Sequence, residues 1–306
     1  MTRRLNLILL LLIVVIGAPY YWFLLDNSGA TLPAKSIGIA QLRQLAAAIP
    51  GEAPYAVEVE RPAFRRIPGN LMVAGSGIKR KLVGYMAFRL LVRGGRPVMI
   101  ESGITATVAA AAGAEQFNIS AQARVDHQMD LAGMILVTHE HPDHLGALAA
   151  HGGTALLQAA WLNPRQLPPA PLAAELAWRG PLPSPRLNGA VPQAVAPGIV
   201  VIPAPNSHTP GSQMIFVRLA DGHELLFAGD NSSFAQNWQQ LRGRSRLVET
   251  WFAPENRAEV FAWLKTIRAL KAQSPGLLVV PGHDWEWLAD PANQTGVRIG
   301  FSPLGG

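Results

Sequence analysis

The chain of 306 residues contains no cysteine, and only 15% of its residues are charged. The absence of a thiol excludes a cysteine nucleophile, and no Gly-x-Ser-x-Gly elbow exists to present a catalytic serine. Ser207, Ser232 and Ser233 are therefore interpreted as turn or supporting residues. The lack of cysteine also fits an oxidising compartment, where stray thiols are a liability, without requiring one.

A basic stripe interleaved with aromatic residues is also absent. The net charge is +6, but the basic residues are dispersed, so nucleic acid is not expected as a partner. Neither internal repeats nor low-complexity tracts occur. A hydrophobic content of 49% supports a full core, and the length allows one large domain or two small ones.

Residues 1–30 form a separate unit. Thr2-Arg-Arg4 precedes an uncharged stretch of 21 residues, Leu5 to Leu25, which is long enough to cross a bilayer as a helix. Tyr20, Tyr21 and Trp22 suit the membrane interface, and the two arginines are expected to stay in the cytoplasm. We expect a signal anchor with the remaining chain on the extracytoplasmic, periplasmic side. The alternative is secretion after cleavage at a small-x-small site such as Ser28-Gly-Ala30.

Histidines are few, and their distribution is the strongest signal in the chain. Five of the eight belong to a set of seven residues that suit divalent metals, namely His139, His141, Asp143, His144, His208, Asp230 and His283. Neutral imidazole and carboxylate favour zinc and related ions. His139 and His141 point the same way on an extended segment, and Pro142 breaks regular structure before Asp143 and His144. This run can fold around two ions.

Short apolar runs precede each part of this set. Met134–Val137 leads to His139, Ile199–Ile202 to His208, Glu224–Gly229 to Asp230, and Leu277–Val280 to His283. Short apolar runs bounded by proline or glycine predict buried strands. Four strands would thus deliver ligands at their C-terminal ends, the usual place for sites in layered α/β proteins.

These segments resemble the metallo-β-lactamase superfamily of metal-dependent hydrolases. The resemblance rests on Thr138-His-Glu-His-Pro-Asp-His-Leu-Gly146, Ser207-His-Thr-Pro-Gly211, Phe227-Ala-Gly-Asp230 and Val280-Pro-Gly-His283, and it spans residues 84 to 284. It implies an α/β fold with four layers, an αββα sandwich of two mixed β-sheets flanked by helices.

The resemblance also implies a division of the ligands. His139, His141 and His208 would hold one metal; Asp143, His144 and His283 would hold the other; Asp230 would bridge them. The expected enzyme is a binuclear hydrolase with two divalent ions, zinc by ligand type, although manganese or iron suits the same residues. A hydroxide shared by the ions would attack a carboxylic ester, lactone, thioester or amide, with Asp143 as the catalytic residue.

Alternative functions remain open at this point. A phosphodiesterase of the same fold and an iron-dependent oxidoreductase are the two main ones, and a non-catalytic binding module is the third. The expected substrate is a small molecule, and the sequence indicates neither its identity nor the oligomeric state.

The sequence departs from the family pattern at three places. Glu101 stands where many members have an aspartate, and either a role beside a metal ligand or a solvated turn suits it. Ser212 replaces a histidine that is not a ligand in the pattern. The segment after Asp230 lacks the tyrosine of many lactonases, which makes lactonase activity less expected without excluding it.

The remaining segments give weaker predictions. Residues 31–54 are expected to be a linker with a short helix over Ile39–Ala48, and residues 55–306 the catalytic domain. Residues 69–76 and 84–92 predict a hairpin, whose loop would bring Lys79, Arg80 and Lys81 to an anionic substrate group or lipid headgroups. Asn231 is a further candidate for a substrate contact. Pro-rich residues 163–198 are expected either to wall the metals or to serve packing alone, and residues 256–272 predict an amphipathic helix.

Overall fold

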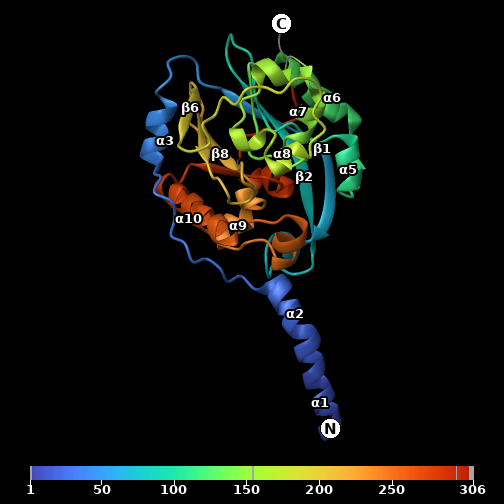
Figure 1. The fold of residues 1–306 in the computed structure, drawn as a ribbon. Helices are drawn as coiled ribbons and strands as arrows, with labels where there is room; N and C mark the ends of the chain where they lie inside the picture. Colours follow the sequence, from blue (N-terminus) through green and yellow to red (C-terminus); the bar gives the residue numbers. More distant parts are fainter. Residues whose placement is uncertain (1, 154, 294, 303–306) are drawn as a thin grey trace.

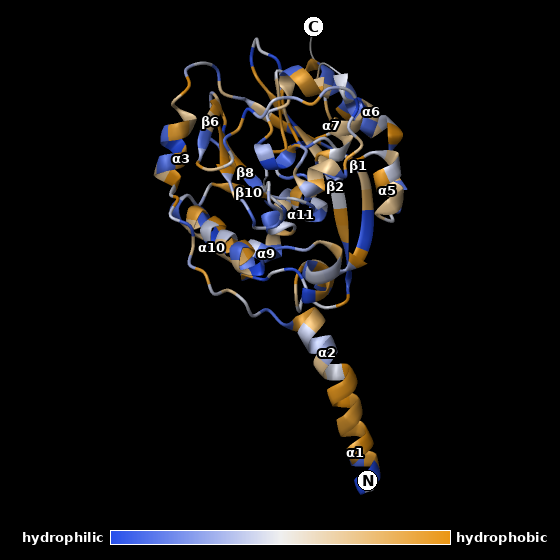
Figure 2. Ribbon diagram, viewed as in Figure 1, coloured by the Kyte–Doolittle hydropathy of each residue, from blue (hydrophilic) through white to orange (hydrophobic). Residues whose placement is uncertain are grey.

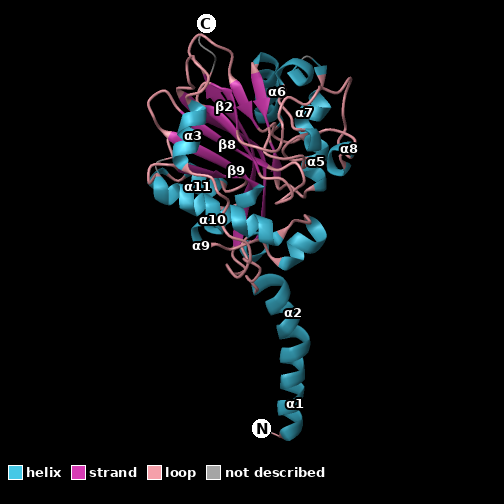
Figure 3. Ribbon diagram, turned by 60° about the vertical axis from the view of Figure 1, so that its left-hand side comes forward, coloured by secondary structure: helices cyan, strands magenta, loops and turns pink. Residues whose placement is uncertain are grey.

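Two β-sheets lie face to face between layers of helices (Figure 3). The computed structural model describes residues 2–153, 155–293 and 295–302. One sheet has the order β11-β1-β2-β3-β5 with β4 paired to β1, and the other has the order β10-β9-β8-β7-β6. Both sheets mix parallel and antiparallel pairs, as in β3–β5 against β2–β3 and β9–β10 against β8–β9.

The strands are β1 (Ala56–Pro68), β2 (Arg80–Leu91), β3 (Val98–Ile100), β4 (Gln116–Phe117), β5 (Met134–Leu136), β6 (Gln193–Ala196), β7 (Ile199–Pro203), β8 (Gln213–Arg218), β9 (Glu224–Gly229), β10 (Leu278–Pro281) and β11 (Arg298–Ile299). The N-terminal helix runs through α1 (Arg3–Leu12), η1 (Ile13–Gly17), α2 (Ala18–Tyr20) and η2 (Tyr21–Leu25). The other helical elements are α3 (Ile39–Ala46), α4 (Gly69–Met72), α5 (Ala106–Ala111), α6 (Ile119–Leu131), α7 (Gly146–His151), η3 (Ala155–Ala159), η4 (Pro164–Gln166), α8 (Pro171–Ala174), η5 (Asp230–Ser232), α9 (Ala235–Gln240), η6 (Val248–Phe252), α10 (Arg257–Gln273), α11 (Trp285–Ala289) and η7 (Pro291–Asn293).

Strand β9 shows why four layers form. Leu225 and Phe227 pack in the core between the sheets, whereas Leu226 and Ala228 pack in the core under α3 and α10. Successive side chains of a strand point to opposite faces, so a strand that is apolar throughout needs cover on both sides. Helices α5, α6 and α7 cover the opposite sheet (Figure 1). The αββα sandwich expected from the sequence is confirmed.

The predicted helices over Ile39–Ala48 and residues 256–272 are confirmed as α3 and α10. The side chain of Asn256 caps α10 by accepting a 3.2 Å hydrogen bond from the Glu259 amide, which the residue preference at helix starts explains. Helix α3 packs into the same core as α10 through Ile39 and Leu42. The boundary predicted at residue 55 stays a prediction.

The predicted strand over residues 69–76 is wrong. This segment forms α4 and a loop, and the hairpin partner of β2 is β1, which ends at Pro68. Strand β1 was not predicted, because its acidic residues Glu58 and Glu60 are of a type usually found at the surface. Glu58 is buried in an ion pair with Arg89, and Glu60 pairs with Arg124 at 2.6 Å. These pairs compensate the carboxylates inside the fold.

The N-terminal helix extends away from the sandwich (Figure 1), and its middle part consists of hydrophobic residues, with hydrophilic residues at its N-terminal end (Figure 2). Residues Arg3 to Leu25 make 23 helical residues, and their most apolar window of 18 residues has a mean hydropathy of 2.4 and no buried residue. This single helix is long enough and apolar enough to be a membrane anchor or a signal sequence.

Candidate metal centre

The seven residues singled out in the sequence converge at one end of the sandwich. His139, His141, Asp143 and His144 lie on the loop after β5, which ends at the start of α7. His208 follows β7, Asp230 follows β9 at the start of η5, and His283 follows β10. The predicted placement at strand ends is therefore what the structure shows.

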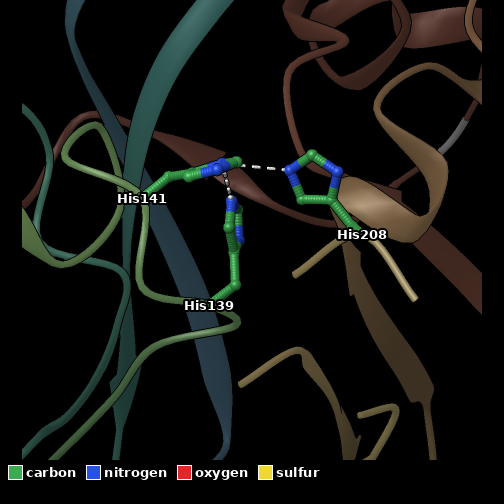
Figure 4. Close-up of side chains that lie close together, drawn as sticks. All are labelled: His139, His141 and His208. Carbon is green, nitrogen blue, oxygen red and sulfur yellow. Dashed lines mark hydrogen bonds between the residues drawn. The ribbon is translucent and has the colours of Figure 1, made fainter. Parts of the chain in front are cut away.

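Three imidazoles form the first group. The ring nitrogen Nδ1 of His141 lies 3.1 Å from Nε2 of His139 and 3.0 Å from Nε2 of His208 (Figure 4). A zinc ion bound tetrahedrally with bonds of 2.0–2.1 Å separates its ligand atoms by about 3.3 Å. The three nitrogens face one another at nearly this spacing, so they could hold one cation.

The second group contains a carboxylate and two imidazoles. His144 and His283 face each other through their Nε2 atoms at 3.3 Å, and an Asp143 oxygen lies 3.7 Å from His283 Nε2. Asp230 lies between the two groups. One of its oxygens is 3.2 Å from His283 Nε2, and the other is 3.5 Å from His208 Nε2. These donors could hold a second cation beside the first.

Buried partners hold two of the rings from behind. His283 Nδ1 donates to the Gly84 carbonyl at 2.8 Å, so its Nε2 presents a lone pair toward the cluster. His208 Nδ1 lies 2.8 Å from a Glu255 oxygen and 2.6 Å from the Arg244 guanidinium, and these contacts orient its Nε2 toward the cluster. Burial lowers the pKa of His139 and His208 and lowers that of His141 to about 3. These rings are neutral at pH 7, so the donor set fits a divalent cation.

Two glycines allow the close approach of strands at the site. A Cβ atom on Gly229, which has φ of +52°, would lie 2.6 Å from Thr138. A Cβ atom on Gly282 would lie 2.3 Å from Asp230 Oδ1. Glycine is needed at both positions, because a side chain on Gly229 would clash with Thr138 and a side chain on Gly282 would displace Asp230.

Glu101 is buried behind His144, so the solvated-turn interpretation is wrong. One oxygen accepts a 2.5 Å hydrogen bond from the Thr138 hydroxyl, and the other lies 3.3 Å from Nδ1 of His144. Its backbone has φ of +66°, an uncommon value for a residue with a side chain. Although burial lowers the pKa of His144, Glu101 and Asp143 raise it to about 9 in the metal-free protein. Glu101 thus turns the Nε2 atom of His144 toward the cluster.

Sequence reasoning missed Arg244 and Glu255. Arg244 is buried, and its guanidinium donates to Asp230 at 2.6 Å and to Glu255 at 2.5 Å. Burial raises the pKa of Glu255 and Arg244 partly offsets this, while His283 and Arg244 hold the pKa of Asp230 well below its usual range despite burial. Neither residue belongs to a recurrent spacing, and only the fold brings them to His208.

Glu140 was also missed, although it stands inside the histidine-rich run. Its side chain accepts hydrogen bonds from the Gly211 amide at 2.9 Å and the Thr209 hydroxyl at 2.8 Å. It therefore points away from the cluster and ties the loop after β5 to the loop that carries His208. The remaining histidines lie outside the site: His127 is exposed, and His151 and His223 pair with Asp130 and Asp221.

A cavity of about 470 Å³ opens above the cluster. We call its inner part the cavity floor, which comprises the cluster residues His141, Asp143, His208, Asp230 and His283 together with Tyr85 and Arg244. We call its outer part the cavity mouth, which comprises Leu71, Met72, Leu247, Val248, Phe252 and Ala253. The remaining lining residues are Arg65, Ile67, Val83 and Pro142. The floor is polar and the mouth is apolar.

The substrate contacts suggested by the sequence do not line this cavity. Lys79 is exposed beside it, Arg80 donates to the Arg66 carbonyl and Glu115, and Lys81 donates to Gln236. Asn231 is buried behind Asp230. None of residues 163–198 lines the cavity either, because this segment packs on the outer helices and sheets. The wall comes instead from α4 and η6, which the sequence did not indicate.

Neither a family model nor a curated protein sequence matches this chain. Among solved structures, it is similar to a quorum-quenching N-acyl homoserine lactone lactonase, with a TM-score of 0.57 and 14% identity over 78% of this chain and 95% of that one. A second is an N-acyl homoserine lactone hydrolase with the product N-hexanoyl-L-homoserine at its catalytic metal centre, with a TM-score of 0.56 and 14% identity over 76% and 95% of the two chains.

A third is a probable metal-dependent hydrolase from Staphylococcus aureus, with a TM-score of 0.55 and 12% identity over 77% of this chain and 91% of that one. At such identities the likeness shows the fold. That fold is the αββα sandwich of two mixed β-sheets that the resemblance in the sequence implied.

Proposed function

We propose that this chain, which has the metallo-β-lactamase fold, is a binuclear metal-dependent hydrolase of a carboxylic ester or lactone. The observation that carries the proposal is the convergence of all seven donors in one cluster, five of which line the cavity floor. His139, His141 and His208 would hold one cation; Asp143, His144 and His283 would hold the other; Asp230 would contact both. Zinc suits this set of nitrogen and carboxylate ligands.

Bound divalent cations supply a water that ionises near neutral pH and an electrophile for the substrate oxygen. The side chains of the protein supply the remaining interactions. Asp143 is half-buried on the cavity floor, where its free oxygen can accept a hydrogen bond from the attacking water. Arg244 holds Asp230 in place from behind through the 2.6 Å hydrogen bond.

Tyr85 supplies a second polar group on the floor. Its ring packs edge-on against His283, with 5.7 Å between centroids, and burial raises the pKa of its hydroxyl to about 12. The hydroxyl therefore stays protonated at neutral pH and can donate to an oxyanion that develops in the transition state. Tyr85 reaches the site from β2, so it replaces in function, not in sequence position, the tyrosine missing after Asp230.

The cavity favours a carboxylic ester or lactone over a phosphodiester. Of the two arginines that line it, Arg244 is engaged by Asp230 and Glu255. Arg65 donates to the Ala112 carbonyl at 2.7 Å. The apolar mouth suits an uncharged group next to the scissile bond.

We also propose that the N-terminal helix is an uncleaved anchor, with the catalytic domain on the extracytoplasmic side. Arg3 and Arg4 support this orientation. Retention is supported by contacts around the alternative cleavage site: Arg257 donates to the Ser28 carbonyl at 2.6 Å, and Arg246 pairs with Asp26 at 2.7 Å. Protease treatment of intact spheroplasts is expected to digest the domain and leave a fragment of about 25 residues in the membrane. A protected domain would contradict the orientation, and a mature N-terminus near residue 31 would contradict the anchor.

The function is tested by metal analysis of the purified full chain, followed by assays with ester, lactone, thioester and phosphodiester panels. We expect about two zinc per chain and hydrolysis of esters or lactones. The His223→Ala variant is the matched control, because this exposed histidine lies outside the site and pairs with Asp221. Iron with redox activity, or no metal uptake on titration, would contradict the proposal.

A further inference from the structure

The cavity mouth and the N-terminal helix meet at one pole of the molecule. Trp251, in η6, packs its ring 4.9 Å from the ring of Phe23 in the last turn of the helix. Arg246 lies over the ring of Trp22 at 4.1 Å. On the other side of the helix end, the Gly75 amide donates to the Leu24 carbonyl at 3.0 Å. The helix therefore leaves the domain between η6 and the loop after α4 (Figure 1).

Large apolar side chains at this pole are exposed. Ile78 in the loop after α4 is 71% exposed, and Phe252 at the rim of the cavity is 74% exposed. Trp251 is 58% exposed in spite of its contact with Phe23. These fractions match that of Ile13 inside the apolar helix, at 66%, so the domain and the helix present the same chemistry to their surroundings. Exposed apolar residues gathered in this way mark a membrane or partner site.

The position of the aromatic residues indicates whether this surface faces a membrane or a protein partner. Tryptophan and tyrosine favour the level of the lipid headgroups. Trp22 would lie at this level if the helix spans a bilayer, and Trp251 lies at the same height because it contacts the neighbouring Phe23. Lys79, next to Ile78, adds an exposed cation that can meet lipid phosphate. A helix attached to the same chain keeps this surface at the bilayer.

We propose that Ile78, Lys79, Trp251 and Phe252 form a membrane-facing surface that rests on the bilayer, and that the cavity takes a substrate with an acyl chain directly from the lipid. Phe252 belongs to both this surface and the cavity mouth, so the path from the headgroups to the floor is apolar. The acyl chain would lie along the mouth while its ester or lactone group reaches the floor. The identity of the reacting group, an ester or lactone, depends on the proposed function, whereas the membrane-facing surface does not.

The surface is tested with the full chain in liposomes, and the absence of native cysteine makes site-specific labelling straightforward. A polarity-sensitive dye is attached at Ile78→Cys or Trp251→Cys, with Arg93→Cys as the control. Arg93 is exposed just after the far end of β2, the strand that begins near this pole. We expect a nitroxide lipid to quench the dyes at 78 and 251 and to spare the dye at 93.

Quenching of the dyes at 78 and 251 by aqueous iodide alone would overturn the surface. Energy transfer between copies labelled at residue 78 that persists on dilution with excess lipid would identify a second copy as the occupant, which would also overturn it. Should Trp251→Cys not fold, the dye at residue 78 carries the test, because Ile78 makes few contacts.

The substrate class is tested by comparing nitrophenyl acetate with nitrophenyl palmitate in the same liposomes. We expect the double variant Ile78→Ser, Trp251→Ser to lose about tenfold in kcat/KM for the palmitate and nothing for the acetate. Neither residue lines the cavity. An equal loss for both esters, or none, would overturn delivery from the bilayer. Hydrolysis of neither ester by the wild-type protein would instead contradict the proposed function, and the dyes would still decide the surface.

Discussion

The floor of the cavity and its mouth are built from different parts of the fold. The floor is formed by polar side chains at the ends of buried strands, each oriented by hydrogen bonds such as those of Glu255 and Gly84. The mouth is formed by apolar side chains on and beside two short helical segments, α4 and η6, and their exposure ranges from the buried Met72 to Phe252, which is 74% exposed. The contrast teaches that rigid strands fix the proposed chemistry, while segments with little packing are free to shape selectivity.

The largest expected effect comes from breaking the donor cluster, whose residues form the floor or lie beneath it. His139→Ala or Asp143→Asn should lower kcat/KM by about three orders of magnitude or more, because each removes a proposed metal ligand. Steady-state kinetics and metal content measure this outcome, with His223→Ala as the control. Full activity in both variants would mean that the floor does not perform the reaction.

Removing the metals should impair the floor of the cavity and leave the mouth unchanged. Chelation is expected to abolish activity and to lower Tm by about 5–10 °C, since ligands that bind only the folded state stabilise it. Calorimetry before and after chelation measures the shift, and return of activity with zinc, manganese or iron identifies the functional metal. A chelated protein with unchanged Tm and activity would refute a metal-dependent floor.

A smaller effect is expected behind the floor. Glu255→Ala should weaken metal affinity by about 10–100-fold, because His208 and Arg244 both lose the buried carboxylate that holds them beside the site. Competition with a chromophoric chelator measures the affinity. Glu259→Ala is the matched control, since this acid lies on the first turn of α10 and pairs with Lys35. Glu255→Gln should recover part of the affinity through its amide oxygen, which a purely structural role would not predict.

The smallest effect is expected at the mouth. Phe252→Ala should raise KM for a long-chain ester by about tenfold and leave kcat within about twofold, because the mouth would contact the apolar group and not the reacting atoms. Val191→Ala, at an exposed position outside the cavity, is the control. A loss in kcat equal to that of the floor variants would remove the distinction between the two regions.

The sequence alone predicted the fold class, the four strands that precede the candidate donors, and the seven donors as a set. Each donor follows an apolar run whose period and bounding residues identify a buried strand, and the metal-binding residue types have few other uses at such positions. The same reasoning did not predict β1. The sequence around Glu58 and Glu60 does not show that these acids form ion pairs with arginines far along the chain.

Only the tertiary structure decided the residues around the floor and at the mouth. Arg244, Glu255 and Tyr85 reach the cluster from α9–α10 connections and from β2, and no local pattern marks a side chain whose partner is distant in sequence. Residues 163–198 were expected either to wall the metals or to serve packing alone; none of them lines the cavity, and the apolar wall comes from α4 and η6. Local patterns report burial and periodicity, whereas long-range packing determines which segments meet, including the approach of the N-terminal helix to the mouth.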